Sequence, residues 1–242
     1  MASDEMLSVL AAPGRLRVAV ASDQHLVEES VGAALYSRGF DTIAIRWPVV
    51  ERTAHGAVPR VVRGGGRGGS RNAPARPDVA VLLSELGTLE QVRCAQLLLG
   101  TLDAPSVVLA GVSRGPVWGA LYESGANLVM PTQTSLDELC GLLDDAHHGR
   151  TPLAAAPRPE LVRSWRSFAH QHRELTDRIQ TLTNREEEVL QQLHEGLGVR
   201  IIAERGEVAE ATVRSQVKAI LRKLDVNSQL AAVAAYQQVR GS

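Results

Sequence analysis

Two kinds of hydrophobic pattern alternate along the first 150 residues of the chain. Short runs that are apolar throughout predict buried strands, and longer stretches with apolar positions three or four residues apart predict helices. The predicted strands are 16–21, 42–45, 79–83, 106–110 and 128–130. The predicted helices are 25–37, 88–99, 117–124 and 135–147, with Thr88 and Ser135 placed to cap the second and the fourth. This alternation is typical of an α/β fold in which a parallel sheet is covered on both faces.

A flavodoxin-like, doubly wound, five-stranded parallel sheet is therefore expected over residues 14–148. One stretch departs from the pattern, because 47–77, where a second helix belongs, contains four prolines and the run RGGGRGGSR. So much Gly and Pro leaves little regular helix, and we expect a loop over 60–77. Its arginines could contact DNA phosphates or a partner, or could simply be solvated. It does not have the flanking strand and Lys-Ser/Thr helix of a phosphate-binding loop.

A linker and a connecting helix are predicted over 149–180, between the two halves of the chain. The run GRTPLAAAPRP at 149–159 is typical of an interdomain linker. From 161 to 180, apolar residues form one edge of an amphipathic helix. That edge could serve self-association or could pack against one of the chain's own domains. The histidines near the linker are expected on the solvated surface: His147, His148, His170 and His172.

Residues 181–242 carry the pattern of an all-α domain of four short helices. Thr183 and Glu186 form a capping box that opens the first helix, and the others are predicted at 199–205, 209–224 and 228–239. The helix over 209–224 has a stripe of buried positions on one face, namely Val213, Val217, Ile220, Leu221 and Leu224. Its opposite face carries polar and basic side chains that can reach base edges or phosphates, namely Arg214, Ser215, Lys218 and Arg222.

This module resembles the helix-turn-helix domain of the LuxR/NarL family of bacterial transcription factors. The resemblance implies that the helix over 209–224 is the recognition helix that enters the major groove of double-stranded DNA. The residues expected to contact DNA are Thr212, Arg214, Ser215, Lys218 and Arg222. It also implies that the last helix, which presents Leu230, Val233 and Ala234, pairs with its twin, so that a homodimer binds an inverted-repeat operator. The alternative is that the basic face is only solvated.

Three residues of the module depart from the family's pattern. Ala209 stands where the family has a Ser that caps the recognition helix, a loss of about 1 kcal/mol that Glu210 partly offsets through the helix dipole. Gly206 replaces a Leu, and we expect this to thin the core at the turn before the recognition helix. Gln216 replaces a frequent His.

The N-terminal half resembles the receiver domain of a two-component response regulator. In that family an Asp at the end of the third strand accepts a phosphoryl group, acidic neighbours hold Mg²⁺, and a Lys follows the fifth strand. This sequence has Ser22-Asp23 after the first strand, Leu83 or Ser84 at the acceptor position, Ala110-Gly111 after the fourth strand and Pro131-Thr132 after the fifth. Asp78 precedes the third strand and lies at its wrong end. We therefore predict a pseudo-receiver without aspartyl phosphorylation.

The carboxyl edge of such a sheet is the usual place for a ligand. The residues expected to line it are Ser22, Asp23, Ser84, Glu85, Ser113 and Arg114. They could form a shallow pocket for a small-molecule effector or a partner. The alternative is a closed surface used for dimerisation.

Composition changes this picture little. A net charge of −1 does not indicate a nucleic-acid binder, but DNA contact needs only one basic face, and both lysines, Lys218 and Lys223, lie on the proposed recognition helix. Cys94 and Cys140 are expected to be buried free thiols. No metal-ligand spacing, catalytic triad or nucleotide loop is found, so we expect no metal, no cofactor and no enzyme activity. The absence of a long apolar run or a secretory leader predicts a cytoplasmic protein without a membrane segment.

Together these patterns predict a bacterial, sequence-specific, DNA-binding regulator of transcription that acts as a homodimer. Its receiver-like domain is expected to respond to a small-molecule or protein signal in place of aspartyl phosphorylation. The alternative is a protein-interaction module that holds another regulator and binds DNA weakly.

Overall fold

The computed structural model describes residues 15–53, 56–60, 76–150 and 158–240. The chain divides into two compact units, Met1–Trp165 and Arg166–Ser242, and each has its own hydrophobic core. The division falls inside the segment predicted to connect the two halves. Within the described ranges, no helix combines the length and the apolar character needed to cross a lipid bilayer.

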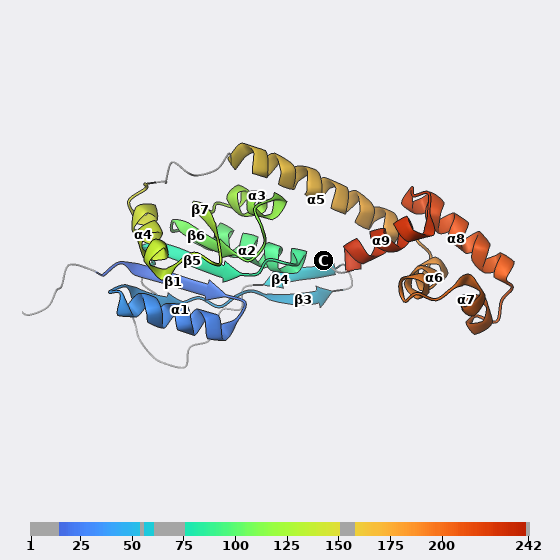
Figure 1. Ribbon diagram of the computed structural model, residues 1–242, viewed down its shortest axis with the longest axis horizontal. Helices are drawn as coiled ribbons and strands as arrows, with labels where there is room; N and C mark the ends of the chain where they lie inside the picture. Colours follow the sequence, from blue (N-terminus) through green and yellow to red (C-terminus); the bar gives the residue numbers. More distant parts are fainter. Residues whose placement is uncertain (1–14, 54–55, 61–75, 151–157, 241–242) are drawn as a thin grey trace, which may run out of the picture. The chain divides into compact units, whose positions relative to one another are not determined.

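A five-stranded parallel sheet forms the centre of the first unit (Figure 1). Its strands are β1 (Arg17–Ser22), β2 (Asp41–Ala44), β5 (Val79–Ser84), β6 (Ser106–Ala110) and β7 (Leu128–Pro131). Their order across the sheet is β2-β1-β5-β6-β7, which is the flavodoxin-like order predicted from the sequence. β1, β5 and β6 are buried almost throughout, because they lie inside the sheet and helices cover both faces. This burial explains their unbroken apolar runs.

Two pairs of helices cover this sheet. They are α1 (His25–Ser37) with α4 (Leu136–His147), and α2 (Leu89–Thr101) with α3 (Pro116–Glu123). The first pair buries Leu35, Leu139 and Leu143 against one face of the strands. The second pair packs together over the opposite face (Figure 1). Thr88 and Ser135 cap α2 and α4 with their side chains, as the sequence predicts, so both helices begin within a residue of the expected position.

An antiparallel hairpin, β3 (Val49–Thr53) and β4 (Gly56–Arg60), follows β2 and is not predicted from the sequence. It occupies the part of the chain where the second helix of a regular doubly wound fold would lie, and it contacts α2. Pro59 is tolerated in β4 because, among the described residues, that strand pairs only with β3 and has an open edge. Of the loop predicted over 60–77, Arg60 belongs to β4, and 61–75 lies outside the described residues.

The helix α5 (Arg158–Gln180) begins earlier than the predicted 161–180 and crosses from the first unit into the second. Near its start it approaches α3 closely: a Cβ added to Gly119 would fall 2.0 Å from the carbonyl oxygen of Leu161. Near its end, Ile179 packs against the core of the second unit. At both ends the helix therefore packs on the chain's own domains, which is one of the two alternatives left by its amphipathic pattern.

Two expectations about individual side chains need correction. His172 is buried, although the other three histidines near the linker are exposed as predicted. It lies on the same face of α5 as the buried Trp165, two turns away, and its ring is 6.2 Å from that of Phe168. Cys94 and Cys140 are both free thiols, but only Cys94 is buried and Cys140 is half-buried.

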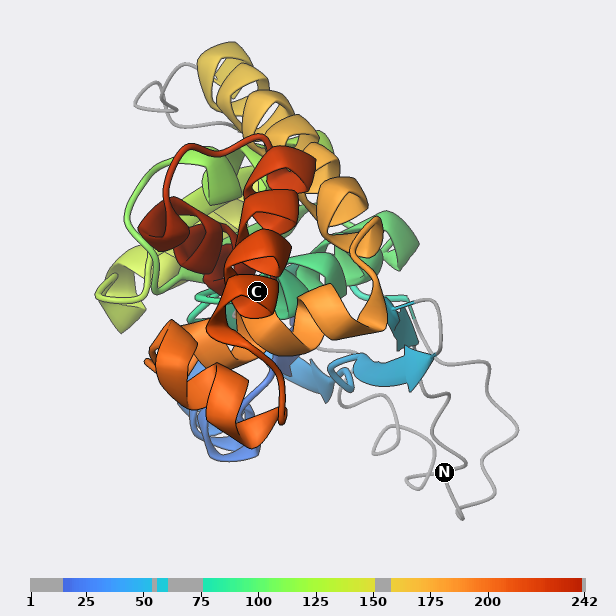
Figure 2. The same ribbon diagram turned by 90° about the vertical axis from the view of Figure 1, so that its right-hand side faces the viewer.

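Four further helices build the second unit around the end of α5 (Figure 2). They are α6 (Asn184–His194), α7 (Val199–Arg205), α8 (Glu210–Leu224) and α9 (Gln229–Arg240). Each begins within one residue of its predicted position. The core is made by buried side chains from all four: Val189, Leu190, Ile202, Val213, Ile220, Leu224 and Tyr236 are at most 1% exposed. Gly196, with a φ of +84°, allows the sharp turn after α6 that brings α7 back onto this core.

Candidate functional site

The helix α8 is divided into a buried face and an exposed face, as predicted. Val213, Ile220 and Leu224 are buried in the core of the second unit, with Val217 and Leu221 partly buried beside them. The side chains assigned to DNA contact are all exposed: Thr212, Arg214, Ser215, Lys218 and Arg222. The helix therefore anchors itself with one face and presents hydroxyl groups and cations on the other.

Contacts on the exposed face of α8 are weak enough to exchange for a ligand. Arg214 Nη2 lies 3.3 Å from Oε2 of Glu210 one turn earlier. An exposed i,i+4 ion pair of this kind contributes roughly a few tenths of a kcal/mol. Ser215 Oγ donates a hydrogen bond to the carbonyl oxygen of Ala211, at 2.9 Å. Among the described residues, Lys218 and Arg222 have no acidic partner within ion-pair distance.

The N-terminus of α8 lacks a side-chain cap. Ala209 is the N-cap residue and its side chain accepts no hydrogen bond, which follows from its chemistry. Glu210 lies in the first turn, where its negative charge interacts favourably with the helix dipole. At the other end, Asp225 closes the helix in the left-handed conformation with a φ of +57°.

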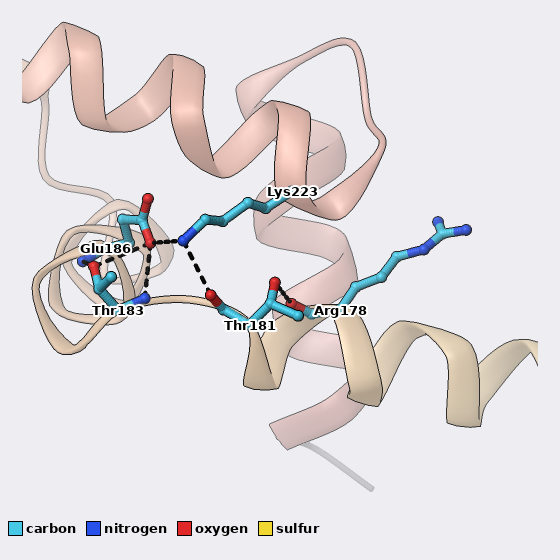
Figure 3. Close-up of polar contacts among 5 residues, drawn as sticks. All are labelled: Arg178, Thr181, Thr183, Glu186 and Lys223. Carbon is cyan, nitrogen blue, oxygen red and sulfur yellow. Dashed lines mark hydrogen bonds and ion pairs between the residues drawn. The ribbon is translucent and has the colours of Figure 1, made fainter.

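Lys223 does not share the exposed face, although it lies on the same helix. Its Nζ donates to Oε2 of Glu186 at 2.6 Å and to the carbonyl oxygen of Thr181 at 3.0 Å (Figure 3). The same Oε2 accepts the backbone N–H of Thr183 at 2.7 Å, within the predicted capping box of α6. The lysine therefore ties the last turn of α8 to the start of α6. Its position three residues after the buried Ile220, at the border of the apolar stripe, is the sequence signal for this inward contact.

The electrostatics of this cluster keep Glu186 ionised. Burial raises the pKa of the Glu186 carboxyl, but the hydrogen bonds from Lys223 and from Thr183 outweigh it and bring the pKa below its ordinary value. A buried carboxylate with these donors fixes the position of α8 relative to α6. This gives the exposed face of α8 a rigid support.

The Arg185 side chain covers the turn before α8, a contact that the sequence did not indicate. A Cβ added to Gly206 would fall 2.3 Å from Nη2 of Arg185, so the guanidinium of Arg185 lies over the glycine. Its Nη1 also pairs with Glu188 at 2.8 Å. The space left by the missing leucine side chain at this turn is thus covered by a cation from α6.

The helix α9 presents an exposed apolar side chain. Leu230 is 80% exposed and Ala234, one turn later, is exposed as well, whereas Val233 is partly buried against the core. On the opposite side Tyr236 is buried, and Arg240 pairs with Glu187 of α6 at 2.6 Å. The helix is therefore fixed on its own unit while the face with Leu230 stays open.

In the first unit, the carboxyl edge of the sheet brings Asp23 and Ser84 together. Ser84, the last residue of β5, donates its hydroxyl to Oδ2 of Asp23 at 2.9 Å. The side-chain amide of Gln91 donates to the same oxygen at 2.7 Å. Asp78 lies at the other end of β5, where it accepts the backbone N–H of Arg17. Among the described residues, no three His, Cys, Asp or Glu side chains are grouped so that they could hold a metal ion.

A cavity of about 420 Å³ opens at this edge, between α1 and α4. Four of the six side chains predicted for a pocket line it: Ser22, Asp23, Ser84 and Glu85. Ser113 and Arg114, in the loop after β6, are not among the described residues that line it. The rest of the lining, which the sequence reasoning missed, comes mainly from the helices and the loop before α4: Gln24, Val27, Ser30, Val31, Ala34, Leu83, Leu109, Thr132, Thr134, Leu136 and Leu139.

The topology and these two sites define a receiver-like α/β unit followed by a helix-turn-helix unit. Residues 180–235 match the sequence profile of the family described as "Bacterial regulatory proteins, luxR family". A LuxR-type helix-turn-helix domain therefore makes up nearly the whole of the second unit beyond α5.

Known proteins similar to this chain include nitrate/nitrite response regulators. The chain is 39% identical to NarP of Escherichia coli K12 over 66 residues, which are 27% of this chain and 31% of NarP. It is 32% identical to NarL of the same strain over 105 residues, 43% of this chain and 47% of NarL. The match thus spans less than half the length of these curated relatives. The response regulator ChrA of a heme-sensing two-component system is similar in fold, with a TM-score of 0.39 at 22% identity over 94% of this chain and 98% of ChrA.

Proposed function

We propose that this protein is a cytoplasmic, sequence-specific DNA-binding regulator of transcription. The observation that carries the proposal is the exposed basic face of α8 within a domain that matches the luxR family. Arg214 would span two acceptors on a guanine edge, and Lys218 would reach a base or a phosphate. Thr212, Ser215 and Arg222 would position the helix through the DNA backbone.

A homodimer is the proposed binding form. Leu230 and Ala234 on α9 offer an exposed apolar face that a second copy would cover. Two recognition helices related by two-fold symmetry would read an inverted repeat, with half-sites about one helical turn apart.

Control of the first unit is proposed to be independent of aspartyl phosphorylation. Ser84 occupies the end of β5, where the receiver family has the acceptor Asp, and the described residues give its hydroxyl no lysine and no group of three acidic or metal-ligating side chains to activate it. The hydroxyl is instead engaged as a donor to Asp23. A small-molecule or protein signal would therefore replace the phosphoryl group.

A second candidate function is a protein-interaction module that holds another regulator and binds DNA weakly. The observation that favours it is the N-terminus of α8, where Ala209 supplies no side-chain cap. A frayed first turn would weaken contacts made by Thr212 and Arg214.

Selection of bound fragments from genomic DNA, with the full chain as bait, tests the first function against the second. The expected result is enrichment of an inverted repeat by the parent and by Arg173→Ala, which removes an exposed arginine of α5. Arg214→Ala should enrich a more degenerate site, at lower yield. Failure of the parent to enrich any sequence would contradict DNA-directed function, and unchanged selection by Arg214→Ala would contradict the assigned face.

A further inference from the structure

The cavity at the carboxyl edge of the sheet combines an apolar wall with a few polar groups. Val27 and Val31 of α1 and Leu139 of α4 contribute to the wall. The two acidic groups of the cavity come from the ends of β1 and β5, where Asp23 and Glu85 follow the strands. A volume of about 420 Å³ and this mixture of surfaces are typical of sites for small organic molecules.

The charged residues that line the cavity are all acidic. Two carboxylates, Asp23 and Glu85, face the cavity, and none of its lining residues is a Lys, Arg or His. The Glu85 side chain lies over the backbone of Gly111, where no Cβ occupies the space. Such a cavity attracts a cation and repels an anion.

Asp23 has one oxygen that is satisfied and one that is not. Oδ2 accepts both the Ser84 hydroxyl and the Gln91 amide. Oδ1 is buried and has no hydrogen-bond partner among the described residues. The negative charge of Asp23 is therefore only partly compensated by its hydrogen bonds, and a cation in the neighbouring cavity would offset it.

Metal ions and anions fit this lining less well than an amine. A divalent cation needs several hard ligands, and the described residues provide no third acidic, His or Cys side chain here. A phosphate or carboxylate ligand would face two negative charges with no cation to offset them. A primary ammonium group offers three N–H donors and a positive charge in a small volume.

We infer that this cavity binds a small organic cation, namely a protonated amine carried on an apolar body. The ammonium group pairs with the carboxylates of Asp23 and Glu85 at the cavity wall, and the apolar body lies between α1 and α4 against Val31 and Leu139. The inference that an amine binds rests only on the properties of the cavity. A regulatory role for this binding also rests on the proposed control of the first unit without phosphorylation.

Titration of the full chain by calorimetry, with the rise in unfolding temperature as a second readout, tests the inference. The probes are phenethylamine and octylamine, with 2-phenylethanol and octan-1-ol as neutral analogues and 3-phenylpropanoate and octanoate as anionic ones. The amines should bind and raise the unfolding temperature. The alcohols should bind at least about tenfold more weakly because they lose the charge-assisted hydrogen bond, and the carboxylates should show no binding.

Three variants localise the site. Asp23→Asn should weaken amine binding by at least about tenfold while leaving the cavity open. Ala34→Phe fills the apolar part of the cavity and should abolish binding with Asp23 intact. Ala33→Phe places the same ring on the neighbouring, exposed position outside this cavity and should bind like the parent.

Several outcomes would overturn the inference. Equal affinity for amines and alcohols, or amine binding unchanged in Asp23→Asn, would exclude the proposed contact. Mg²⁺ that displaces the amine from the parent but does not bind Asp23→Asn would assign the site to a metal. If the protein selects a DNA site but binds neither amine, the inference about the cavity is wrong and the proposed function stands. If it binds the amines but selects no DNA site, the proposed function is wrong and the inference about the cavity stands.

Discussion

Lys223 Nζ lies 2.6 Å from Oε2 of Glu186, so the last turn of the proposed recognition helix is joined to the first turn of α6 by an ion pair (Figure 3). The carboxylate is 10% exposed and the lysine 27% exposed, so water screens the pair only in part. One lysine of α8 therefore supports the fold, while the other, Lys218, is free to face DNA.

Lys223→Met should destabilise the second unit by about 2 kcal/mol, because it leaves the buried carboxylate of Glu186 without its charged partner. Urea denaturation followed by circular dichroism measures the change in the free energy of unfolding. Lys218→Met, on the exposed face of the same helix, is the matched control and should change it by less than about 0.5 kcal/mol. Equal losses in the two variants would contradict the supporting role of Lys223.

Acid should weaken the second unit through Glu186. Its pKa is lowered in the folded state, so its contribution to stability is complete above the unfolded value, about 4.3, and is lost as the pH falls through the lower folded value. Unfolding free energies measured from about pH 6 to about pH 3 should decrease more steeply in the parent than in Lys223→Met. Identical pH profiles would show that the pair does not shift this carboxyl.

Lys218→Met should weaken binding of the selected DNA site and of unrelated DNA to a similar degree, if the lysine contacts a phosphate. The slope of log affinity against log salt concentration should then fall by about one unit, because one fewer counterion is released. Fluorescence anisotropy over a range of salt concentrations measures it. A loss confined to the selected site would instead place Lys218 on a base.

Two glycines should differ in how much a methyl group destabilises the protein. Gly119→Ala should destabilise the first unit by about 1 to 3 kcal/mol, because its Cβ would meet the backbone carbonyl of Leu161. Gly206→Ala should cost less, at most about 1 kcal/mol, because its Cβ clashes with the far end of the flexible Arg185 side chain and lies 3.2 Å from the carbonyl oxygen of Ile202. Thermal unfolding of both variants checks the contrast, which would fail if Gly119→Ala were as stable as the parent.

Phosphoryl donors should leave the oligomeric state and the DNA affinity unchanged. Ser84 stands at the acceptor position and is engaged with Asp23, and the described residues provide no group of three metal ligands beside it. Gel filtration and anisotropy with acetyl phosphate or beryllofluoride measure the effect. Any response that disappears in Ser84→Ala would contradict the pseudo-receiver assignment.

Regular elements of this fold follow directly from local sequence patterns. The inner strands β1, β5 and β6 are almost entirely apolar because they are buried on both faces, and the helices α2, α4 and α6 begin after Thr88, Ser135 and Thr183 because these side chains cap them. The hairpin β3–β4 could not be predicted in the same way. Pro48 and Pro59 suggest irregular chain, and a proline is compatible with a strand only when that strand has an unpaired edge, which is a tertiary property.

The candidate sites were predictable only as far as local periodicity defines a face. The stripe of α8 fixes which side chains are exposed, so Arg214 and Lys218 were placed correctly on its outer surface. The contact of Lys223 with Glu186 joins residues far apart in the chain and depends on how α8 packs on α6. The cavity lining depends likewise on where α1 and α4 end relative to the strands, which is why Ser113 and Arg114 were included and Val31 was not.

Thr181 belongs to the short turn that connects α5 to α6, and its carbonyl oxygen is the second acceptor of Lys223. The ammonium group of Lys223 thus joins the turn at the end of the long helix α5 to the proposed recognition helix. A rotation of α5 about its own axis would act on this contact as well as on the packing of Ile179 against the core. The support of the basic face therefore includes the turn after a helix that itself carries none of the proposed base contacts.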